Sequence, residues 1–347
     1  IEIGKPLFDI ESRSKVSDIP FYHHLQNMAK ETVQIIHNGK YTPKNSDSLI
    51  EIKDKINEMV KNTETIKPDV QFTFKESIMS HKRNNFCPVE ILDDLSLNVA
   101  KIIQTQKNIE KVCVLNFASA TQPGGGFLHG RQAQEEYLSR SSVLYESIKH
   151  QKEMYGYHKR NRDPFYTDYM IYSPKVAVIR DNNGDLTQPF YVSFITSAAV
   201  NFNQIMQNYY EEKKFIQEDD FFNSLNFNDN DNDDNNDYDE DKDCIDDKDL
   251  IDMQVKTRNV MFTRCKKILQ LAFCKGDRAI VLGAFGCGVF KNDPEMISLI
   301  FKELLFEGKY EYAKFFDYIA FAILKGKHDS TNFDVFEKNL MRVYTEL

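Results

Sequence analysis

The chain of 347 residues contains no apolar run long enough to cross a membrane. A membrane helix needs about 18 consecutive apolar residues, whereas the longest apolar run here, residues 319–324, has the length of a strand. The first ten residues also lack the basic-then-apolar pattern of a secretory signal. We therefore expect a protein that makes no contact with membranes.

Paired cysteines and metal-binding patterns are also missing. Six cysteines and eight histidines are scattered along the chain without the short spacings of a zinc site or a disulfide framework. Cys113 and Cys265 lie in apolar or helical runs, which favours buried, reduced thiols. We expect no metal, no cofactor and a reducing compartment, either the cytosol or the nucleus.

The common nucleotide-binding motifs are absent as well. The sequence from Gly283 reads GxxGxG, not the GxGxxG of a dinucleotide fold followed by an acidic residue. No glycine-rich stretch ends in the GK[ST] of a nucleotide hydrolase. ATP turnover is therefore disfavoured.

Negative charge is concentrated in one segment. The chain has a net charge of −9, but residues 218–252 alone carry sixteen acidic residues against two lysines, so the rest sums to +5. This composition cannot bury enough apolar surface to offset the entropy of ordering, and we expect residues 218–250 to be a disordered surface insert. Its Asp-x-Asp spacing suggests calcium, but the loop glycine and closing glutamate of an EF-hand are missing. The mildly basic remainder suits an anionic ligand.

Periodicity predicts alternating helices and strands. Expected helices cover residues 20–39, 53–60, 97–105, 134–148, 251–272, 294–304 and 333–340; expected strands cover 49–52, 70–74, 89–92, 112–115, 176–179, 191–196, 279–282 and 315–324. Residues 181–184 (DNNG) predict a hairpin turn, and residues 151–168 are expected to form a loop. This order predicts a three-layer α/β/α sandwich with a mixed central sheet. We treat residues 1–347 as one domain, with residues 1–105 as an N-terminal helical extension packed on it.

Residues 111–148 hold the most informative stretch. A buried strand is followed by Gly124, Gly125 and Gly126, whose backbone can take positive φ and approach a ligand closely. Such a loop can turn successive N–H groups toward a diphosphate. A helix then begins with Gln134, Glu135 and Glu136. Paired carboxylates beside a phosphate-type loop suggest chemistry on a phosphate-bearing sugar, although acidic residues in a first turn also simply offset the helix dipole.

A second glycine-rich loop follows the strand at residues 279–282. It contains Gly286, Cys287, Gly288, Val289 and Phe290. Since ligands of open α/β sheets bind at the carboxyl ends of the strands, the two loops are expected to meet at that edge.

These residues also carry a family resemblance. GGG, seven residues and then QEE resembles the motif of poly(ADP-ribose) glycohydrolases of the macrodomain superfamily, and VLGAFGCGVFKNDP at residues 281–294 resembles the second ligand loop of their microbial, bacterial-like branch. The resemblance implies a macrodomain-like fold and hydrolysis of ribose–ribose O-glycosidic bonds, mainly from the polymer end. It implies that Glu136 is the general acid and later the base, that Glu135 and Gln134 hold ribose hydroxyls, and that Asn116 binds ribose. It further implies that Gly124 to Gly126 and Gly286 to Val289 cradle the diphosphate while Phe290 packs on the terminal ribose.

Several alternatives stay open from the sequence. Phe290 can equally be an ordinary core residue, and Asn116 a structural turn residue. A mono-ADP-ribosyl-protein hydrolase is the alternative enzyme, and an ADP-ribose-binding macrodomain reader without catalysis is the alternative of another class; the intact QEE triplet disfavours the reader. We expect poly(ADP-ribose), ADP-ribose and ADP-ribosylated proteins as partners, no direct nucleic-acid binding, and a monomer.

Overall fold

The computed structural model describes residues 19–74, 76–225, 247–326 and 329–346. The helices are α1 (Ile19–Asn38), α2 (Lys53–Asn62), α3 (Glu76–Met79), α4 (Ser96–Gln106), α5 (Gln134–Ser141), α6 (Leu144–Ile148), α7 (Lys152–Asn161), α8 (Phe202–Leu225), α9 (Asp247–Cys274), α10 (Pro294–Phe306) and α11 (Thr331–Glu346). Two 3₁₀ turns, η2 (Phe127–His129) and η4 (Tyr312–Lys314), lie between them. The strands are β1 (Lys40–Tyr41), β2 (Ile50–Glu51), β3 (Glu64–Ile66), β4 (Val89–Leu92), β5 (Val112–Phe117), β6 (Met170–Arg180), β7 (Leu186–Ser197), β8 (Ala279–Leu282) and β9 (Tyr318–Ala322).

A mixed sheet of seven strands forms the middle layer, in the order β3-β6-β7-β5-β8-β9-β4. β5 lies at its centre and pairs in parallel with β7 on one side and β8 on the other, while β6 is antiparallel to both β3 and β7. The register places Val112 beside Ala279 and Cys113 beside Ser193. The two glycine-rich loops therefore leave the same edge of the sheet from neighbouring strands.

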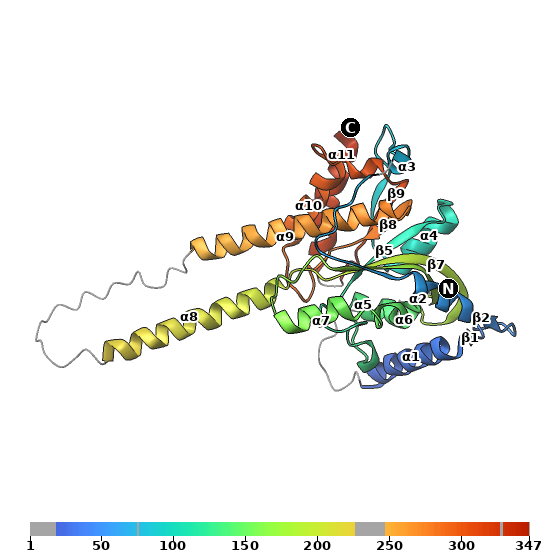
Figure 1. Cartoon of the computed structure of the whole chain (residues 1–347), viewed down its shortest axis with the longest axis horizontal. Helices are drawn as coiled ribbons and strands as arrows, with labels where there is room; N and C mark the ends of the chain where they lie inside the picture. Colours follow the sequence, from blue (N-terminus) through green and yellow to red (C-terminus); the bar gives the residue numbers. More distant parts are fainter. Residues whose placement is uncertain (1–18, 75, 226–246, 327–328, 347) are drawn as a thin grey trace, which may run out of the picture.

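Helices cover both faces of this sheet (Figure 1). Alternate residues of β5 point to opposite faces: Val112 and Val114 pack with α1, α2, α4 and α5, whereas Cys113 and Leu115 pack with α9, α10 and α11. Both faces are dry and apolar, which explains why the central strands read as continuous apolar runs. The expected three-layer sandwich is confirmed.

Local signals explain several element boundaries. Gly184 has a φ of +82° and donates its N–H to the Asp181 carbonyl at 3.0 Å, closing the predicted hairpin between β6 and β7. Pro174, which has no N–H, lies where the β6–β7 register shifts between Ser173 and Val176. At the start of α10, Asp293 accepts a hydrogen bond from the Glu295 N–H, with Pro294 in the first turn.

Some sequence-based predictions were wrong. Residues 70–74 form no strand; the edge strand of this region is β3, six residues earlier. Residues 152–161, expected in a loop, form α7, whose inner side is made of Met154, Tyr155 and His158. That stretch offers few aliphatic residues, so its helical periodicity was hidden among tyrosines and charges.

The N-terminal part is less separate than expected. β3 and β4 are the two edge strands of the main sheet, so residues 64–106 belong to the sandwich itself. Only α1, the β1–β2 pair and α2 are additions to it, and they pack on η2, α5, α6 and β6. Residues 1–18 lie outside the described part of the chain.

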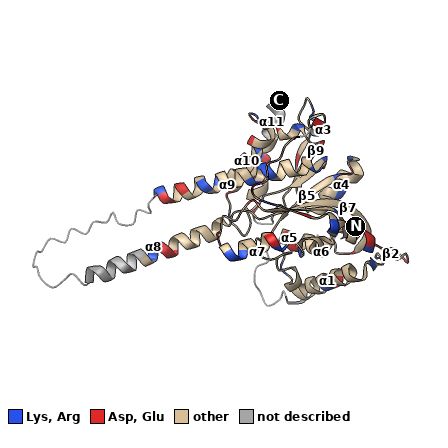
Figure 2. Cartoon of the chain, viewed as in Figure 1, with Lys and Arg blue, Asp and Glu red and all other residues tan. Residues whose placement is uncertain are grey.

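Two long helices, α8 and α9, project from the body of the molecule (Figure 1). An ion pair of 3.4 Å between Lys213 and Asp249 links them, and charges of both signs lie along α9 (Figure 2). The predicted disordered insert, residues 218–250, is helical at both ends, up to Leu225 and from Asp247; its centre, residues 226–246, lies outside the described residues. None of the described helices is apolar over a length that would span a bilayer.

Candidate active site

Glu135, the first of the paired carboxylates, is held by the loop that follows β5. It is 2% exposed, and its Oε2 accepts the Ser119 N–H at 2.7 Å. Its Oε1 accepts the Gly124 N–H at 3.2 Å and the Asn116 side-chain amide at 3.3 Å. Three donors from β5 and its loop therefore fix this carboxyl group in place.

Glu136 is held differently. It is 7% exposed, and its Oε1 accepts the Gly126 N–H at 2.9 Å. No donor among the described residues reaches its Oε2, which leaves one oxygen available to a ligand. Position 125 requires a glycine, because its φ is +56° and a Cβ there would lie 2.4 Å from Glu136 Oε1.

The environment of Glu135 favours its protonated form. Burial, opposed by the three hydrogen bonds and assisted by the charge of Glu136, raises the pKa of Glu135 to about 8. At neutral pH Glu135 therefore holds a proton next to the Glu136 carboxyl group.

Gln134 and Asn116 connect the helix start to the central strand. The Gln134 side chain accepts a hydrogen bond from the Phe117 N–H at 2.8 Å and donates one to the Leu115 carbonyl at 2.7 Å. Its amide thus satisfies two backbone groups at the end of β5. Asn116 is fully buried and also donates to Thr196 Oγ1 at 3.1 Å. Its own Oδ1 has no partner among the described residues.

The N–H groups of the first glycine loop are all engaged. Gly124 and Gly126 donate to the two glutamates, and Gly125 donates to the Gln122 carbonyl at 3.0 Å. The expectation that these three N–H groups face a diphosphate is therefore not met by this geometry. The loop instead positions carboxyl groups, an arrangement that spacing alone did not reveal.

The second glycine loop presents the free backbone groups. No described residue accepts a hydrogen bond from the N–H of Gly288, Val289 or Phe290. Gly288 has open space where a Cβ would be, and Val289 is 59% exposed. Gly286, with a φ of +81°, is instead packed tightly, since its Cβ would lie 2.6 Å from both Ala199 and the Asn292 side chain. Cys287 is buried and donates its N–H to the Ala284 carbonyl, so it supports the loop from the core side.

Phe290 is partly buried against the core and has a second aromatic neighbour. Its ring lies 6.2 Å from that of Tyr166, a residue with the unusual φ of +51°. Tyr166 in turn packs on His158 at 5.3 Å. Neither Tyr166 nor His158 was predicted from the sequence, because neither belongs to a glycine loop and residues 151–168 were expected to be irregular.

His158 links two loops at the edge of the site. Its Nδ1 lies 3.1 Å from the Ala120 carbonyl and its Nε2 accepts the Thr167 N–H at 3.1 Å. Burial lowers the pKa of His158, so the ring is neutral and its one N–H donates to Ala120. The histidine thereby holds the loop after β5 to the loop before β6.

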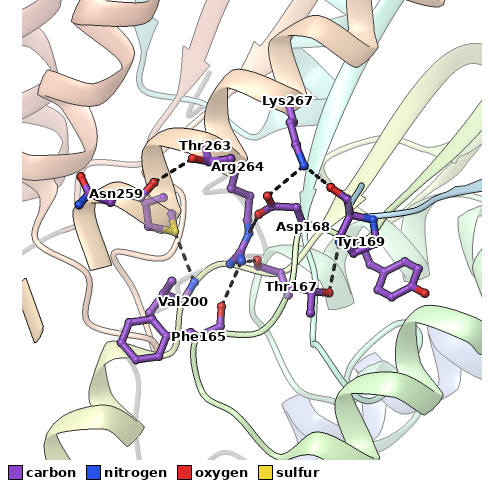
Figure 3. Close-up of polar contacts among 12 residues, drawn as sticks. Phe165, Thr167, Asp168, Tyr169, Val200, Asn259, Thr263, Arg264 and Lys267 are labelled. Atoms are coloured by element: carbon purple, nitrogen blue, oxygen red, sulfur yellow. Dashed lines mark hydrogen bonds and ion pairs between the residues drawn. The ribbon is translucent and has the colours of Figure 1, made fainter. Parts of the chain in front are cut away.

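Arg264 of α9 supports the same region through several polar contacts (Figure 3). It is fully buried, contacts Asp168 at 3.2 Å, and donates to the carbonyls of Ala198 and Phe165 at 2.9 and 3.1 Å. Lys267 adds a second cation 3.2 Å from Asp168. The segments carrying Tyr166 and Ala199, which meet the second glycine loop, are thus fastened to α9. No sequence pattern indicated this role for Arg264.

The donor set of this site suits sugar and phosphate groups. Within the described residues, no three histidines, cysteines or acidic residues are grouped so that they could share a metal ion. The paired carboxyl groups begin α5 and are held by the loop after β5, and the N–H groups without an acceptor among the described residues lie on the loop after the adjacent β8. Acid–base chemistry on a ligand with an anionic portion is what these groups can perform.

Comparison with known proteins agrees with this geometry. Residues 29–181 match the model of the microbial-type PARG catalytic domain. Poly(ADP-ribose) glycohydrolase (PARG) from Thermomonospora curvata is 30% identical, with a TM-score of 0.70, over 91% of this chain and 99% of that chain; its structure with the inhibitor ADP-HPD gives a TM-score of 0.69 over the same shares. The enzyme from Deinococcus radiodurans in complex with ADP-ribose is 26% identical, with a TM-score of 0.62, over 83% and 97%. No curated protein matches.

The fold and the two loops define a macrodomain-like α/β hydrolase. The chain belongs to the family of microbial-type poly(ADP-ribose) glycohydrolases.

Proposed function

We propose that the chain hydrolyses poly(ADP-ribose) at its ribose–ribose O-glycosidic bonds and releases ADP-ribose, mainly from the polymer end, with Glu136 as general acid and base. The observation that carries this proposal is the Glu136 carboxyl group, in which one oxygen accepts the Gly126 N–H and the other has no donor among the described residues. The similar proteins from Thermomonospora curvata and Deinococcus radiodurans carry the name poly(ADP-ribose) glycohydrolase, and the second is in complex with ADP-ribose.

In the first half of the reaction, Glu136 transfers its proton to the ribose oxygen that leaves. The bond between that oxygen and the anomeric carbon breaks through an oxocarbenium-like state. The ionised Glu136 then takes a proton from a water molecule, whose oxygen attacks the anomeric carbon, and this restores the acid. Adjacent helical residues point about 100° apart, so Glu135 does not flank the same bond as a nucleophile.

Glu135, Gln134 and Asn116 act as positioning residues in this scheme. Glu135 fixes the glycine loop that holds Glu136, and Gln134 fixes the first turn of α5 to β5. In this scheme, their polar groups that lack a partner among the described residues bind ribose hydroxyls. Asn116 Oδ1 is one such group.

The diphosphate is assigned to the second glycine loop. Free N–H groups at Gly288, Val289 and Phe290 form a nest of the kind that binds anions. Gly286 and Cys287 shape this loop from the core side, and the Phe290 ring, backed by Tyr166, packs on the terminal ribose. Gly124, Gly125 and Gly126 contribute by placing the carboxyl groups and by allowing the ribose to approach closely.

The substitution Glu136→Gln tests this assignment. It keeps size and polarity but cannot donate a carboxyl proton, and general acid–base catalysis is typically worth about 10²–10⁴-fold. Turnover should become barely detectable, while ADP-ribose affinity measured by calorimetry should stay near that of the wild type. Near-normal hydrolysis by this variant would place the acid elsewhere. Loss of both affinity and thermal stability would show that Glu136 only stabilises the helix start.

Substrate preference needs a separate measurement. The wild-type protein is incubated with labelled polymer and with protein carrying single ADP-ribose units. Release of ADP-ribose from the singly modified protein alone would favour a mono-ADP-ribosyl hydrolase, and binding without release would favour a reader. Long fragments early in polymer digestion would contradict the exo mode.

We extend the proposal to the cellular compartment and the protein partners. Cys87, Cys113, Cys265 and Cys287 are buried and unpaired, which supports a reducing compartment such as the cytosol or nucleus. ADP-ribosylated proteins are the partners that such an activity would meet there.

A further inference from the structure

We propose that Arg131 binds the diphosphate of the polymer unit that leaves, on the opposite side of the cleaved bond from the terminal ADP-ribose. This inference rests on the function proposed above and adds a substrate contact to it. Neither the glycine loops nor the paired glutamates predicted such a contact from the sequence.

The Arg131 side chain lies directly against the first glycine loop. A Cβ on Gly126 would be 2.4 Å from Arg131 Cδ, 2.8 Å from Cγ and 3.1 Å from Nε. Gly126 is also the residue whose N–H binds Glu136 Oε1. The guanidinium group therefore lies beside the residue that holds the general acid, and the absence of a side chain at Gly126 makes room for it.

The backbone of Arg131 is fixed from two sides. Its N–H donates to the Gly126 carbonyl at 3.3 Å, after Gly130, with a φ of +78°, has turned the chain back. Its own carbonyl accepts a hydrogen bond from Arg140 Nη1. Arg140 is a fully buried residue of α5, so this second contact comes from the packed interior. The backbone from which the Arg131 side chain extends is therefore fixed by the fold.

The charge of Arg131 has no partner among the described residues. Its side chain is exposed, and no described carboxylate lies within ion-pair distance of it. By contrast, the buried Arg180 and Arg264 each face an acidic residue. An arginine that lies against the loop holding the proposed general acid, and that has no partner among the described residues, is available to an anionic part of the substrate.

The chemistry of the polymer indicates which anion that is. Glu136 delivers its proton to the leaving oxygen, so the leaving unit lies on the side of its carboxyl group. That unit carries a diphosphate on the same ribose as the leaving oxygen. The first loop has no free N–H among its three glycines, because these all have internal acceptors. The second glycine loop is therefore assigned to the diphosphate of the terminal unit, and Arg131 is assigned to the diphosphate of the leaving unit.

The test compares two substrates that differ in their leaving group. One is poly(ADP-ribose), and the other is an aryl glycoside of ADP-ribose, whose leaving group carries no phosphate. For Arg131→Ala, kcat/KM on the polymer should fall about 10- to 100-fold, as expected for loss of a hydrogen-bonded charge pair. On the aryl glycoside, kcat/KM and the affinity for ADP-ribose should change less than about twofold, since neither involves this contact.

Matched variants separate charge from folding. Arg131→Lys should recover part of the rate on the polymer, because it retains the charge but loses the fork of donors. Lys30→Ala removes an exposed charge of α1 and should leave both substrates unaffected. Thermal unfolding of each variant shows whether the fold is intact.

Three results would overturn the assignment of Arg131. Equal losses on both substrates, or weaker ADP-ribose binding, would place it on the terminal unit or in a structural role. An unchanged rate on the polymer would show that it makes no contact. A wild-type protein that cleaves the aryl glycoside but not the polymer would instead overturn the proposed function itself.

Discussion

Replacing Gly125 by alanine should disable the site while leaving the fold in place. Gly125 has a φ of +56°, and its Cα faces the carboxyl group of Glu136. An added Cβ would lie 2.4 Å from Glu136 Oε1, 2.9 Å from Glu136 Cδ and 3.2 Å from Glu135 Oε2. In the alanine variant, the backbone at position 125 and the two carboxyl groups therefore cannot all keep their positions.

The expected magnitude has two parts. The left-handed backbone conformation costs a residue with a Cβ about 1–2 kcal/mol. Ordinary contact distances begin near 3.4 Å, so the Glu136 carboxyl group must move by about 1 Å, a misplacement that can cost about 10²-fold in rate. Gly125→Ala should therefore lose about 10²-fold in kcat and only modest stability.

Gly308→Ala is the matched control, because Gly308 also has a positive φ, +61°, but no atom within 4 Å of the added Cβ. It should lose similar backbone stability and keep full turnover. Polymer hydrolysis and chemical denaturation are measured for both variants. If Gly125→Ala hydrolyses at the wild-type rate, the Glu136 carboxyl group is not where catalysis takes place. If both variants lose activity equally, the effect is one of backbone strain alone.

Two further predictions concern stability. Arg264→Met removes the fully buried cation, so that Asp168 keeps only Lys267 and the Ala198 and Phe165 carbonyls lose their donor. It should lower the free energy of unfolding by about 3–5 kcal/mol, whereas Arg258→Ala, which removes an exposed ion pair, should cost about 1 kcal/mol or less; similar denaturation midpoints would contradict this. Because the pKa of Glu135 is raised from 4.5 to about 8, the folded state binds the additional proton, and stability should fall as pH rises between these values. Glu135→Gln should flatten that dependence in thermal unfolding from pH 5 to 9, and an unchanged slope would mean that another group causes it.

The layered fold could be predicted because its evidence is local. The apolar runs of β5 and β8 and the turn residues 181–184 identify buried strands and a hairpin without knowledge of their neighbours. α7 could not be recognised, because its buried side consists of Met154, Tyr155 and His158, which carry no clear apolar period. The short strand β3 belongs to the sheet through its pairing with β6, and such pairing leaves no local pattern.

The contact between the first glycine loop and the paired glutamates could be predicted from the sequence, but its hydrogen bonds could not. The spacing of GGG and QEE indicated that loop and carboxyl groups belong together. It did not show that the Gly124 and Gly126 N–H groups bind those carboxyl groups. Nor could it show Arg131 against Gly126, because that contact depends on how the chain turns at Gly130.

The position of β5 between β7 and β8 also affects how the protein forms during synthesis. Val112 of β5 pairs with Ala279 of β8, far along the chain. At about 5–20 residues per second, a ribosome completes β8 roughly 10–30 s after β5. For most of that interval the nascent chain contains both glutamates and an open strand edge, but not the loop assigned to the diphosphate. Such an edge is prone to aggregation, so this architecture makes the growing chain a natural client of chaperones.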